Sequence, residues 1–466
     1  MRNLLVTSSL LLSLCACTNG NDANWEKAMN DPAAANLARP TQTQYDWQEQ
    51  DLAMFIQLDP ATHQQREYDD GSTPMSELTF ENLDVNQWCQ AAKAFGAKEI
   101  VFMLAHSGGF CMWPSSTTNY HIGNTPYKGG NGDVVKEFAQ ACRDNGLNAG
   151  FYLWAPHPSE EGDTPNTVDY SKLDQVRTRE ESNEMLKTRF HEIMDRLGSD
   201  LVTEIWIDQP IHAKIGKEIA ERAPRAVVAA VGCHDPYPSI RWPGTETGTV
   251  SDPCWSVTTK EQMSIPCTTQ FEADGNQKQG TDNPDGDFWA PHQADTQLHH
   301  GCWHMRPSAL ENRKSVDELM DCYIKSIGRN SFLILNCAPM PDGSVHPDDM
   351  KRYQEFGAEI ERRFGSPIAT VTKVPANEVI LELDKPSAIG YTDLSEAYQY
   401  GQRVRAYEIE GYDVDSKQWI PIAAGTSVGK RKIDVIDVPN VFSKLKAKIT
   451  TSVGTPLISQ FQVHAK

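Results

Sequence analysis

The segment Leu201-Val202-Thr203-Glu204-Ile205-Trp206-Ile207-Asp208-Gln209-Pro210 has the composition of a buried β-strand that ends in a carboxylate. Its β-branched and aromatic residues favour a strand, and Pro210 cannot donate a further ladder hydrogen bond. In a parallel barrel the carboxyl ends of the strands face the active site, so Asp208 would lie at that face. A turn or capping aspartate at a strand end would give the same local pattern. Segments elsewhere in the chain separate the two interpretations.

Strand-like and helix-like segments alternate on both sides of this stretch. Near-continuous apolar runs, typical of strands buried on both faces, lie at 51–58, 98–104, 148–154, 226–231 and 332–335. Helical periodicity separates them at 83–95, 132–145, 180–197, 211–223, 315–328 and 347–364. This alternation predicts an α/β fold, a (β/α) TIM-like barrel. No Gly-x-Gly-x-x-Gly turn follows the first strand, which disfavours a dinucleotide-binding fold.

The pattern changes after residue 365, which suggests a second domain. Short, largely alternating strands at 379–383, 403–411, 419–424 and 458–464 predict a C-terminal β-sandwich. Residues 18–44 are rich in Asn, Asp, Ala and Pro, a composition typical of a linker. The predicted organisation is a signal peptide at 1–17, a linker at 18–44, a catalytic barrel at 45–365 and a β-sandwich at 366–466.

The first residues predict an exported protein. Arg2 precedes a short apolar run that is too short to span a membrane, and Ala16-Cys17 follows it. This arrangement resembles a bacterial lipoprotein signal, with Cys17 as the lipidated residue because Leu14 before Cys15 is too bulky. We therefore expect a lipid-anchored protein, periplasmic or at the cell surface, with a membrane tether through Cys17. A plain secretory signal is the alternative.

Charge and cysteine content limit the partners. The formal net charge is 43 − 63 = −20, which argues against nucleic acid or anionic lipid as a partner. Cys254, Cys267 and Cys302 lie in a loop-rich region of an exported chain, where a disulfide could form. The cysteines within apolar periodic runs are expected to be buried thiols, namely Cys89, Cys142, Cys322 and Cys337.

The sequence predicts neither a metal site nor a cofactor. No cysteine pair has metal-finger spacing, and the three histidines considered as ligands, His157, His212 and His234, have no ligand-like spacing. We interpret those histidines as surface or loop residues. A divalent ion in the β-sandwich cannot be recognised from the sequence.

A second carboxylate stands in the segment Arg241-Trp242-Pro243-Gly244-Thr245-Glu246-Thr247-Gly248. Glycines on both sides allow close backbone approach, and aromatic neighbours such as Trp242 could desolvate Glu246, as a general acid requires. A solvent-facing loop glutamate is the alternative. Two acids on different loops of one barrel face would suit glycoside hydrolysis, in which one protonates the leaving oxygen and the other attacks or activates water.

Several segments, in order, resemble glycoside hydrolase family 29, the α-L-fucosidase family. They are Met54-Phe55-Ile56, Gly109-Phe110-Cys111-Met112-Trp113-Pro114-Ser115, Gly132-Asp133-Val134-Val135-Lys136-Glu137-Phe138, Gly150-Phe151-Tyr152-Leu153, Glu204-Ile205-Trp206-Ile207-Asp208, Gly244-Thr245-Glu246-Thr247-Gly248, Gly328-Arg329-Asn330 and Gly401-Gln402-Arg403-Val404. The resemblance implies an exo-acting, retaining glycosidase with Asp208 as nucleophile and Glu246 as acid/base. Retaining enzymes hold these carboxyl groups about 5 Å apart, so an ionised Asp208 would raise the pKa of Glu246.

The chain departs from this family at positions that usually bind the sugar ring. Gln57 replaces the usual His after Met-Phe-Ile, and His106-Ser107 replaces a usual His-His pair. The segment from Asp295 to His304 stands where Arg and Trp are usual. A rebuilt pocket would favour another terminal sugar, since polar pockets reject sugars that leave their groups unpaired. Release of α-L-fucose and hydrolysis of another α-glycoside, such as an α-L-galactoside or an α-D-glucoside, therefore both stay open.

Further residues are predicted to bind the oligosaccharide or glycan. Trp113, Trp154, Trp206 and Trp303 could stack on sugar faces, although core packing is the alternative for each. The other predicted pocket residues follow strand ends or family positions, namely Gln57, His106, Ser107, Tyr152 and His299. A non-catalytic glycan-binding lipoprotein is the alternative from another functional class.

Overall fold

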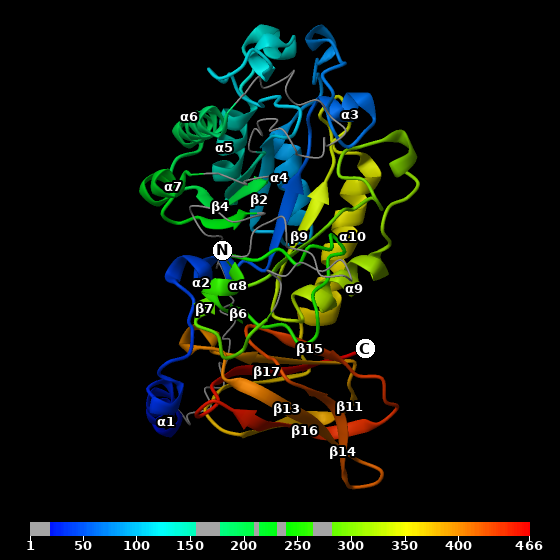
Figure 1. Ribbon diagram of the computed structural model, residues 1–466. Coiled ribbons are helices and arrows are strands. Elements are labelled where there is room, and N and C mark those ends of the chain that lie inside the picture. The colour runs from blue at the N-terminus through cyan, green and yellow to red at the C-terminus, as the bar shows by residue number, and fades with distance from the viewer. Residues whose placement is uncertain (1–18, 155–177, 209–213, 231–238, 264–281) are drawn as a thin grey trace, which may run out of the picture.

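The structure is a computed structural model that describes residues 19–154, 178–208, 214–230, 239–263 and 282–466 (Figure 1). A helix-covered sheet occupies the upper part of the view, and two antiparallel sheets lie below it. Among the described residues, no helix has the length and apolar character needed to cross a membrane.

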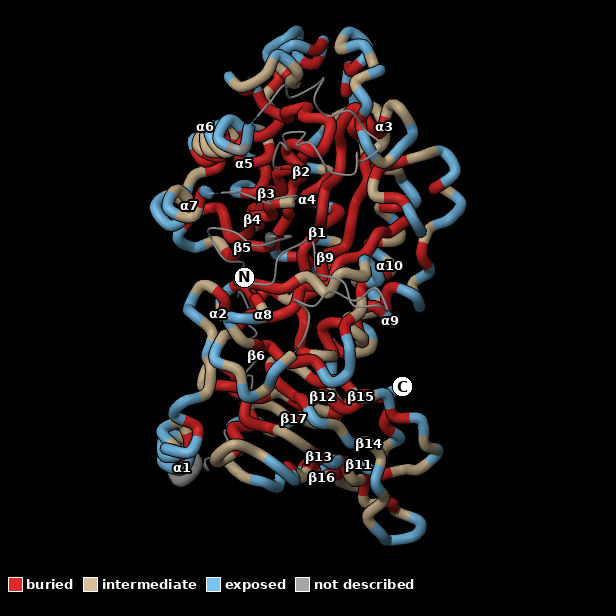
Figure 2. The backbone as a smooth tube through the Cα atoms, viewed as in Figure 1, coloured by how far each residue is buried: buried red, intermediate tan, exposed pale blue. Residues whose placement is uncertain are grey.

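The upper domain is built on a seven-stranded parallel sheet in the order β5-β4-β3-β2-β1-β9-β8. The strands are β1 (Leu52–Ile56), β2 (Glu99–Ala105), β3 (Asn148–Trp154), β4 (Val202–Asp208), β5 (Val227–Ala230), β8 (Gln293–Thr296) and β9 (Phe332–Cys337). Every residue of β1, β2 and β9 is buried, and Figure 2 shows the buried chain concentrated in this sheet. The prediction of a TIM-like barrel from continuous apolar runs is confirmed.

Residues 239–241 connect the two edges of this sheet. The backbone N–H of Ser239 donates to the carbonyl of Val228 in β5 at 2.9 Å. On the other side the N–H of Arg241 donates to Pro291 at 2.8 Å, and Gln293 of β8 donates back to Arg241 at 2.8 Å. The short segment therefore takes the place of a full strand between β5 and β8, and it leads directly into the loop that carries Glu246.

Helices cover the outside of the sheet (Figure 1). They are α4 (Val85–Ala94), α5 (Val134–Asn145), α6 (Arg179–Leu197), α7 (Gly216–Arg222), α9 (Val316–Ser326) and α10 (Pro347–Phe364), with the short α3 (Pro60–Gln64) and α8 (Lys260–Met263) in connections. Helix α5 shows the sequence logic, because Asp133 caps its first turn by accepting from the N–H of Lys136, and Gly146 ends it at φ +67°. Helix α7 is shorter than the predicted 211–223, of which 211–213 lie outside the described residues.

The C-terminal domain is a β-sandwich of two four-stranded antiparallel sheets, β10-β17-β12-β15 and β11-β16-β13-β14. Its strands are β10 (Ala369–Val374), β11 (Glu378–Ala388), β12 (Tyr391–Glu396), β13 (Val404–Asp413), β14 (Trp419–Gly425), β15 (Lys432–Val435), β16 (Val441–Ser452) and β17 (Ile458–His464). Strand β11 buries Val379 and Leu381 while Ile380 is exposed, the alternation expected of a sheet with one wet face. The predicted strands are present, and β10, β12, β15 and β16 were not predicted.

The expected linker at 18–44 is structured over most of its length. It contains α1 (Asn19–Met29), a short 3-10 turn and the start of α2 (Gln42–Gln48). The fully buried guanidinium of Arg403 donates to the carbonyls of Ala28 at 2.7 Å and Met29 at 3.2 Å. Asp31 accepts from the N–H of Thr455 at 2.7 Å. The segment therefore packs on the sandwich, where Ala28 and Met29 also join an apolar cluster with Ala397 and Leu457. The polar overall composition of the segment does not reveal these contacts.

The cysteines show no disulfide among the residues that are described. Cys254 and Cys302, for which a disulfide was considered, are both free thiols, while Cys267 lies outside the described residues. The four cysteines expected to be buried thiols are free and buried, namely Cys89, Cys142, Cys322 and Cys337. Cys111, for which no prediction was made, is buried as well. Their side chains behave as small core residues.

Candidate active site

Asp208 is the last residue of β4 and is held by a tyrosine of the neighbouring strand. Strands β3 and β4 pair in a register that places Trp154 beside Asp208. Two residues earlier on β3, Tyr152 donates its hydroxyl to Oδ2 of Asp208 at 2.7 Å. Burial and then the charge of Asp208 raise the pKa of Tyr152 well above its usual range, so the hydroxyl keeps its proton and continues to donate. A strand-end carboxylate is thereby fixed by a neutral donor.

Glu246 lies on a loop whose backbone is held in an uncommon conformation. Its φ is +49°, and Gly244 and Gly248 on either side also have positive φ. Its Oε2 accepts from Nε1 of Trp303 at 2.9 Å and from Nε2 of Gln297 at 3.1 Å. The side chain reaches solvent, but surrounding protein displaces part of its hydration, so the pKa of Glu246 is raised.

The charges around Glu246 act in the same direction. Glu67 and Asp208 each raise the pKa of Glu246, while the bond from Trp303 lowers it in part. Asp208 and Glu246 therefore influence one another within one site, as two carboxyl groups that share a substrate should. A carboxyl group with a raised pKa is suited to hold a proton and then give it away.

Asp295 is a third carboxyl group at this edge of the barrel. It lies near the end of β8, is 4% exposed, and accepts a hydrogen bond from Nε1 of Trp242 at 2.7 Å. Burial raises the pKa of Asp295 to about 7, and the charges of Glu246 and Asp208 add to this effect. Trp242 was expected to desolvate Glu246, whereas its indole N–H donates to Asp295.

An aromatic group of residues adjoins Tyr152. His106 follows β2, and its ring centroid lies 5.0 Å from Trp154, 5.7 Å from Tyr152 and 5.6 Å from His304. Tyr68 stacks on the same ring at 5.7 Å and is 41% exposed. His106 and Tyr152, both predicted to line the pocket, therefore lie next to one another. Ser107 is buried beside them, with its Oγ 3.3 Å from Nδ1 of His106.

His304 is the charged member of this group. Its Nε2 lies 3.2 Å from Asp59, and its Nδ1 lies 3.8 Å from Glu67, which also pairs with Arg306 at 2.8 Å. Burial opposes protonation, yet these carboxylates raise the pKa of His304 to about 10. Burial and the charge of His304 lower the pKa of His106 to about 4. One imidazolium and one neutral imidazole therefore stand side by side.

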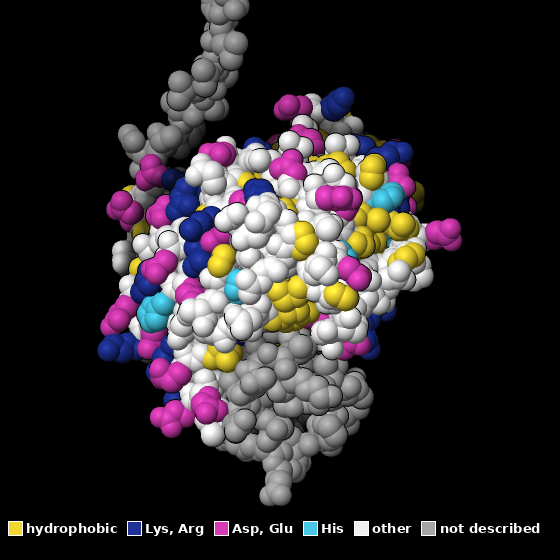
Figure 3. Space-filling model, turned by 90° about the horizontal axis from the view of Figure 1, so that it is seen from above, with side chains coloured by type: hydrophobic (Ala, Val, Ile, Leu, Met, Phe, Trp, Pro, Cys, Tyr) yellow, Lys and Arg dark blue, Asp and Glu magenta, His cyan; other side chains and the backbone are white. Residues whose placement is uncertain are grey.

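Figure 3 shows the molecule from above, looking onto the top of the parallel-sheet domain. Charged side chains of both signs are scattered over this face, and hydrophobic side chains gather in one patch toward its right edge and in another below its centre. Such a face offers apolar surface beside polar groups, a combination that suits the mixed faces of a sugar.

A family model described as alpha-L-fucosidase matches residues 22–363. The chain belongs to the α-L-fucosidase family. An Oryza sativa subsp. japonica protein provisionally named alpha-L-fucosidase 1 is 30% identical over a 512-residue alignment, covering 99% of this chain and 91% of that protein. The family is also glycoside hydrolase family 29, so the resemblance drawn from the sequence segments is confirmed and the chain is a glycosidase.

Solved structures show the same fold. A Bacteroides thetaiotaomicron protein provisionally described as an alpha-L-fucosidase superposes with a TM-score of 0.81 at 27% identity, covering 92% of this chain and 100% of that chain. A Ruminococcus gnavus GH29 fucosidase in complex with fucose has a TM-score of 0.77 at 24% identity, covering 94% and 97% of the two chains. The latter likeness concerns the fold alone.

Within this fold, two predicted stacking tryptophans are core residues. Trp113 is fully buried and donates to Glu192 at 2.7 Å, on the helix side of the sheet. Trp206 is 4% exposed and donates inside the barrel to Glu204 and Gln293. Neither ring has a face open to a sugar, so the pocket prediction is wrong for both. Side chains alternate along β4, and Trp206 lies two residues below Asp208 on the inward face.

The prediction of His299 as a pocket residue is also wrong. His299 is 1% exposed, and both ring nitrogens are engaged, Nδ1 with the carbonyl of Ala309 at 2.7 Å and Nε2 with Asp349 at 3.0 Å. It anchors the loop after β8, and the neighbouring Trp303 and His304 reach the site instead.

Gln57 lies at the end of β1, 6% exposed, and its backbone N–H donates to the carbonyl of Cys337.

Sequence reasoning did not single out Asp59, Glu67, Tyr68, Gln297, Asp295 or His304 as site residues. Asp59 follows the end of β1 by three residues, so its strand-end position could have indicated it. Glu67 and Tyr68 lie in a polar connection without periodicity, where no local pattern distinguishes a pocket residue from a surface one.

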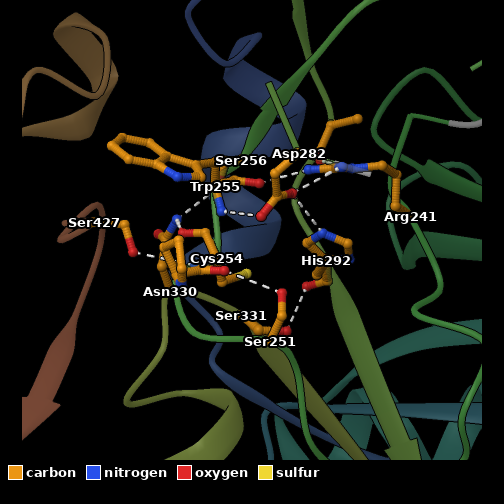
Figure 4. Close-up of polar contacts among 12 residues, drawn as sticks. Arg241, Ser251, Cys254, Trp255, Ser256, Asp282, His292, Asn330, Ser331 and Ser427 are labelled. Carbon is orange, nitrogen blue, oxygen red and sulfur yellow. Dashed lines mark hydrogen bonds and ion pairs between the residues drawn. The ribbon is translucent and has the colours of Figure 1, made fainter. Parts of the chain in front are cut away.

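One cluster outside this site has the chemistry of metal ligands. Atoms of Cys254, Asp282 and His292 lie within 4.8 Å of one another (Figure 4). The fully buried guanidinium of Arg241 lies 3.0 Å from Oδ1 of Asp282, which is also 3.0 Å from Nε2 of His292. Arg241 already supplies the cation that Asp282 needs, so we interpret the cluster as a buried ion pair that holds the 239–241 connection. His157, His212 and His234 lie outside the described residues.

Replacing Tyr152 by Phe tests the contact to Asp208. We expect kcat/KM on an aryl α-L-fucoside to fall by about 10- to 100-fold, because a hydrogen bond to a charged group contributes ~1.5–3 kcal/mol. The matched control is Tyr412→Phe, in the sandwich domain, which should leave kcat/KM unchanged. An unchanged rate in Tyr152→Phe with the fold intact would show that the bond has no part in activity.

Proposed function

We propose that the protein is an exo-acting, retaining α-L-fucosidase that removes terminal α-L-fucose from oligosaccharides or glycans, with Asp208 as nucleophile and Glu246 as acid/base. The observation that supports this most is the placement of Asp208, fixed by Tyr152 at a strand end, beside a Glu246 whose pKa its charge helps to raise. The relatives named as fucosidases support the choice of sugar.

The reaction has two steps. In the first, a carboxylate oxygen of Asp208 attacks the anomeric carbon, the glycosidic C–O bond breaks, and Glu246 transfers its proton to the leaving oxygen. In the second, Glu246 removes a proton from water, the water oxygen attacks the anomeric carbon, and the bond to Asp208 breaks. Two inversions give net retention and return both carboxyl groups to their starting states. Tyr152 holds Asp208 throughout, and Trp303 and Gln297 orient Glu246.

A different terminal sugar is the second candidate, and specific positions favour it. Gln57 and Ser107 replace the histidines that the family usually carries, so the set of hydrogen-bonding groups near β1 and β2 has changed. His304 lies close to His106 and pairs with Glu67, so these two side chains offer hydrogen-bonding groups in place of the missing histidines. An α-L-galactoside differs from the fucoside only by a C6 hydroxyl, and an α-D-glucoside differs more widely.

Nucleophile replacement tests the assignment of Asp208. Asp208→Ala should lower kcat on an aryl α-L-fucoside on the order of 10³-fold or more, as removal of a catalytic group does elsewhere. Azide should restore turnover and give the glycosyl azide of inverted configuration, because it attacks from the face that the carboxylate has left. Asp144→Ala, on the exposed side of α5, is the control. Substantial activity in Asp208→Ala without azide would exclude this residue as nucleophile.

A panel of p-nitrophenyl glycosides tests the sugar. We expect kcat/KM to be highest for the α-L-fucoside, lower for the α-L-galactoside and lowest for the α-D-glucoside, since an added hydroxyl needs a partner in a pocket shaped for a methyl group. A preference for the galactoside or the glucoside would assign the altered pocket to that sugar and remove fucose from the proposal.

We also propose that the protein is lipid-anchored at the periplasmic face or cell surface through Cys17, on the basis of the N-terminal sequence alone. Residues 1–18 lie outside the described part of the structure. An alkyne fatty acid fed to the expressing bacterium should label the protein, and Cys17→Ala should lose the label while Cys15→Ala keeps it. Label in Cys17→Ala, or none in the unaltered protein, would reject the anchor.

A further inference from the structure

The loop that carries Glu246 is attached to β8 at both of its ends by one residue. At the start of the loop, Nε1 of Trp242 donates to Oδ1 of Asp295 at 2.7 Å. At its end, the N–H of Gly248 donates to the main-chain carbonyl of the same Asp295 at 2.8 Å. A bridge between Thr247 and Thr296 continues this pairing. The side chain and the backbone of Asp295 therefore span the whole turn.

The next residues of the same segment reach the carboxyl group itself. Gln297, two positions after Asp295, donates to Oε2 of Glu246 at 3.1 Å. Trp303 donates to that same oxygen at 2.9 Å. Glu246 has a φ of +49°, a conformation that a non-glycine residue keeps only where its surroundings impose it. Segment 295–303 therefore fixes both the backbone and the carboxyl group of Glu246.

We infer that Asp295 is the positioning residue of the acid/base, acting through Trp242 and the 242–248 turn to hold Glu246 where it can protonate the leaving oxygen. This inference rests on the proposed role of Glu246. Asp295 does not touch substrate in this arrangement, because it is 4% exposed and its Oδ1 is occupied by the indole of Trp242. Burial raises the pKa of Asp295 to about 7, so near neutral pH this carboxyl group is protonated part of the time and adds less negative charge beside Asp208 than a fully ionised one would.

A series of aryl α-L-fucosides distinguishes positioning of the acid from general support of the fold. A dinitrophenolate leaves without protonation, whereas an unactivated phenolate needs the proton from Glu246. Misplacing Glu246 should therefore slow the phenyl fucoside by about tenfold or more, within the 10²–10⁴-fold that general acid catalysis contributes, and slow bond cleavage in the dinitrophenyl fucoside by less than about threefold.

The variants are Asp295→Leu and Trp242→Phe, each of which removes one side of the Asp295–Trp242 bond. Both should show the leaving-group dependence, and azide should accelerate turnover of the dinitrophenyl fucoside by assisting the second step. Asp295→Asn should stay within about threefold of the unaltered protein on both substrates, because its amide oxygen can accept from Trp242. If Asp295→Leu does not fold, Trp242→Phe carries the same test with the packing of the ring retained.

Two comparisons fix the interpretation. Glu99 is another buried carboxyl group, at the end of β2 away from the site, and it accepts a hydrogen bond from Thr203 at 2.5 Å. Glu99→Gln should change the rates on all the fucosides by the same factor. Glu246→Ala should show the strongest leaving-group dependence. A uniform loss in Asp295→Leu and Trp242→Phe, or no loss, overturns the role of Asp295. Absence of the dependence in Glu246→Ala instead overturns the assignment of the acid/base, and with it this inference.

Discussion

The parallel pairing of β3 with β4 is the constraint on which the site depends. Its register sets Trp154 beside Asp208, and this brings the hydroxyl of Tyr152 within 2.7 Å of the carboxylate. Because all seven strands of the sheet run the same way, the residues that follow their ends converge on one edge. His106 after β2 and Asp295 near the end of β8 reach that edge for the same reason. A strand out of register by one residue would turn Asp208 to the other face.

The hydrogen-bond donors around Glu246 leave the pKa of this carboxyl group raised. The groups that donate to Glu246 are an indole and an amide, neither of which carries a charge. Such donors orient a carboxyl group without the strong stabilisation of its anion that a guanidinium would give. The pKa of Glu246 therefore stays raised by burial and by the neighbouring acids. Charge compensation is instead placed at His304, between Asp59 and Glu67.

The sequence predicted the elements whose residues carry a strong local pattern. The sequence places the end of β4 at Asp208 and the end of helix α10 at Phe364, as the structure does. Both elements can be recognised without tertiary information, because one is a continuous apolar run and the other has helical periodicity. Strand β16 was missed although its buried Leu445, Ala447 and Ile449 alternate with lysines, which is the local pattern of a strand with one wet face. Strand β12 was missed because it buries the polar Thr392 and Asp393. The partners of β12 lie on strands distant in sequence, so only the assembled sheet makes this segment recognisable.

Some residues of the site could likewise be predicted from local sequence and others could not. Glu246 could be identified because glycines flank it, whereas His299 and His304 lie in one segment and differ only in which side of the loop each occupies. The structure buries His299 against Asp349 and gives His304 to the pocket. Which of the two histidines faces the pocket depends on the path of the loop after β8, and no local sequence pattern predicts that path. Family resemblance supplied the position of the segment and not the orientation of its side chains.

The proposed mechanism requires Asp208 to form a covalent bond to the sugar. A 2-deoxy-2-fluoro-α-L-fucosyl fluoride should trap this ester by slowing its hydrolysis, and mass spectrometry of peptides from the labelled protein would locate the sugar. We expect one fluorofucosyl group per chain, on the peptide that contains Asp208. A label on any other residue would rule out Asp208 as the nucleophile. Hydrolysis of the reagent without any labelled protein at any time would rule out a covalent intermediate.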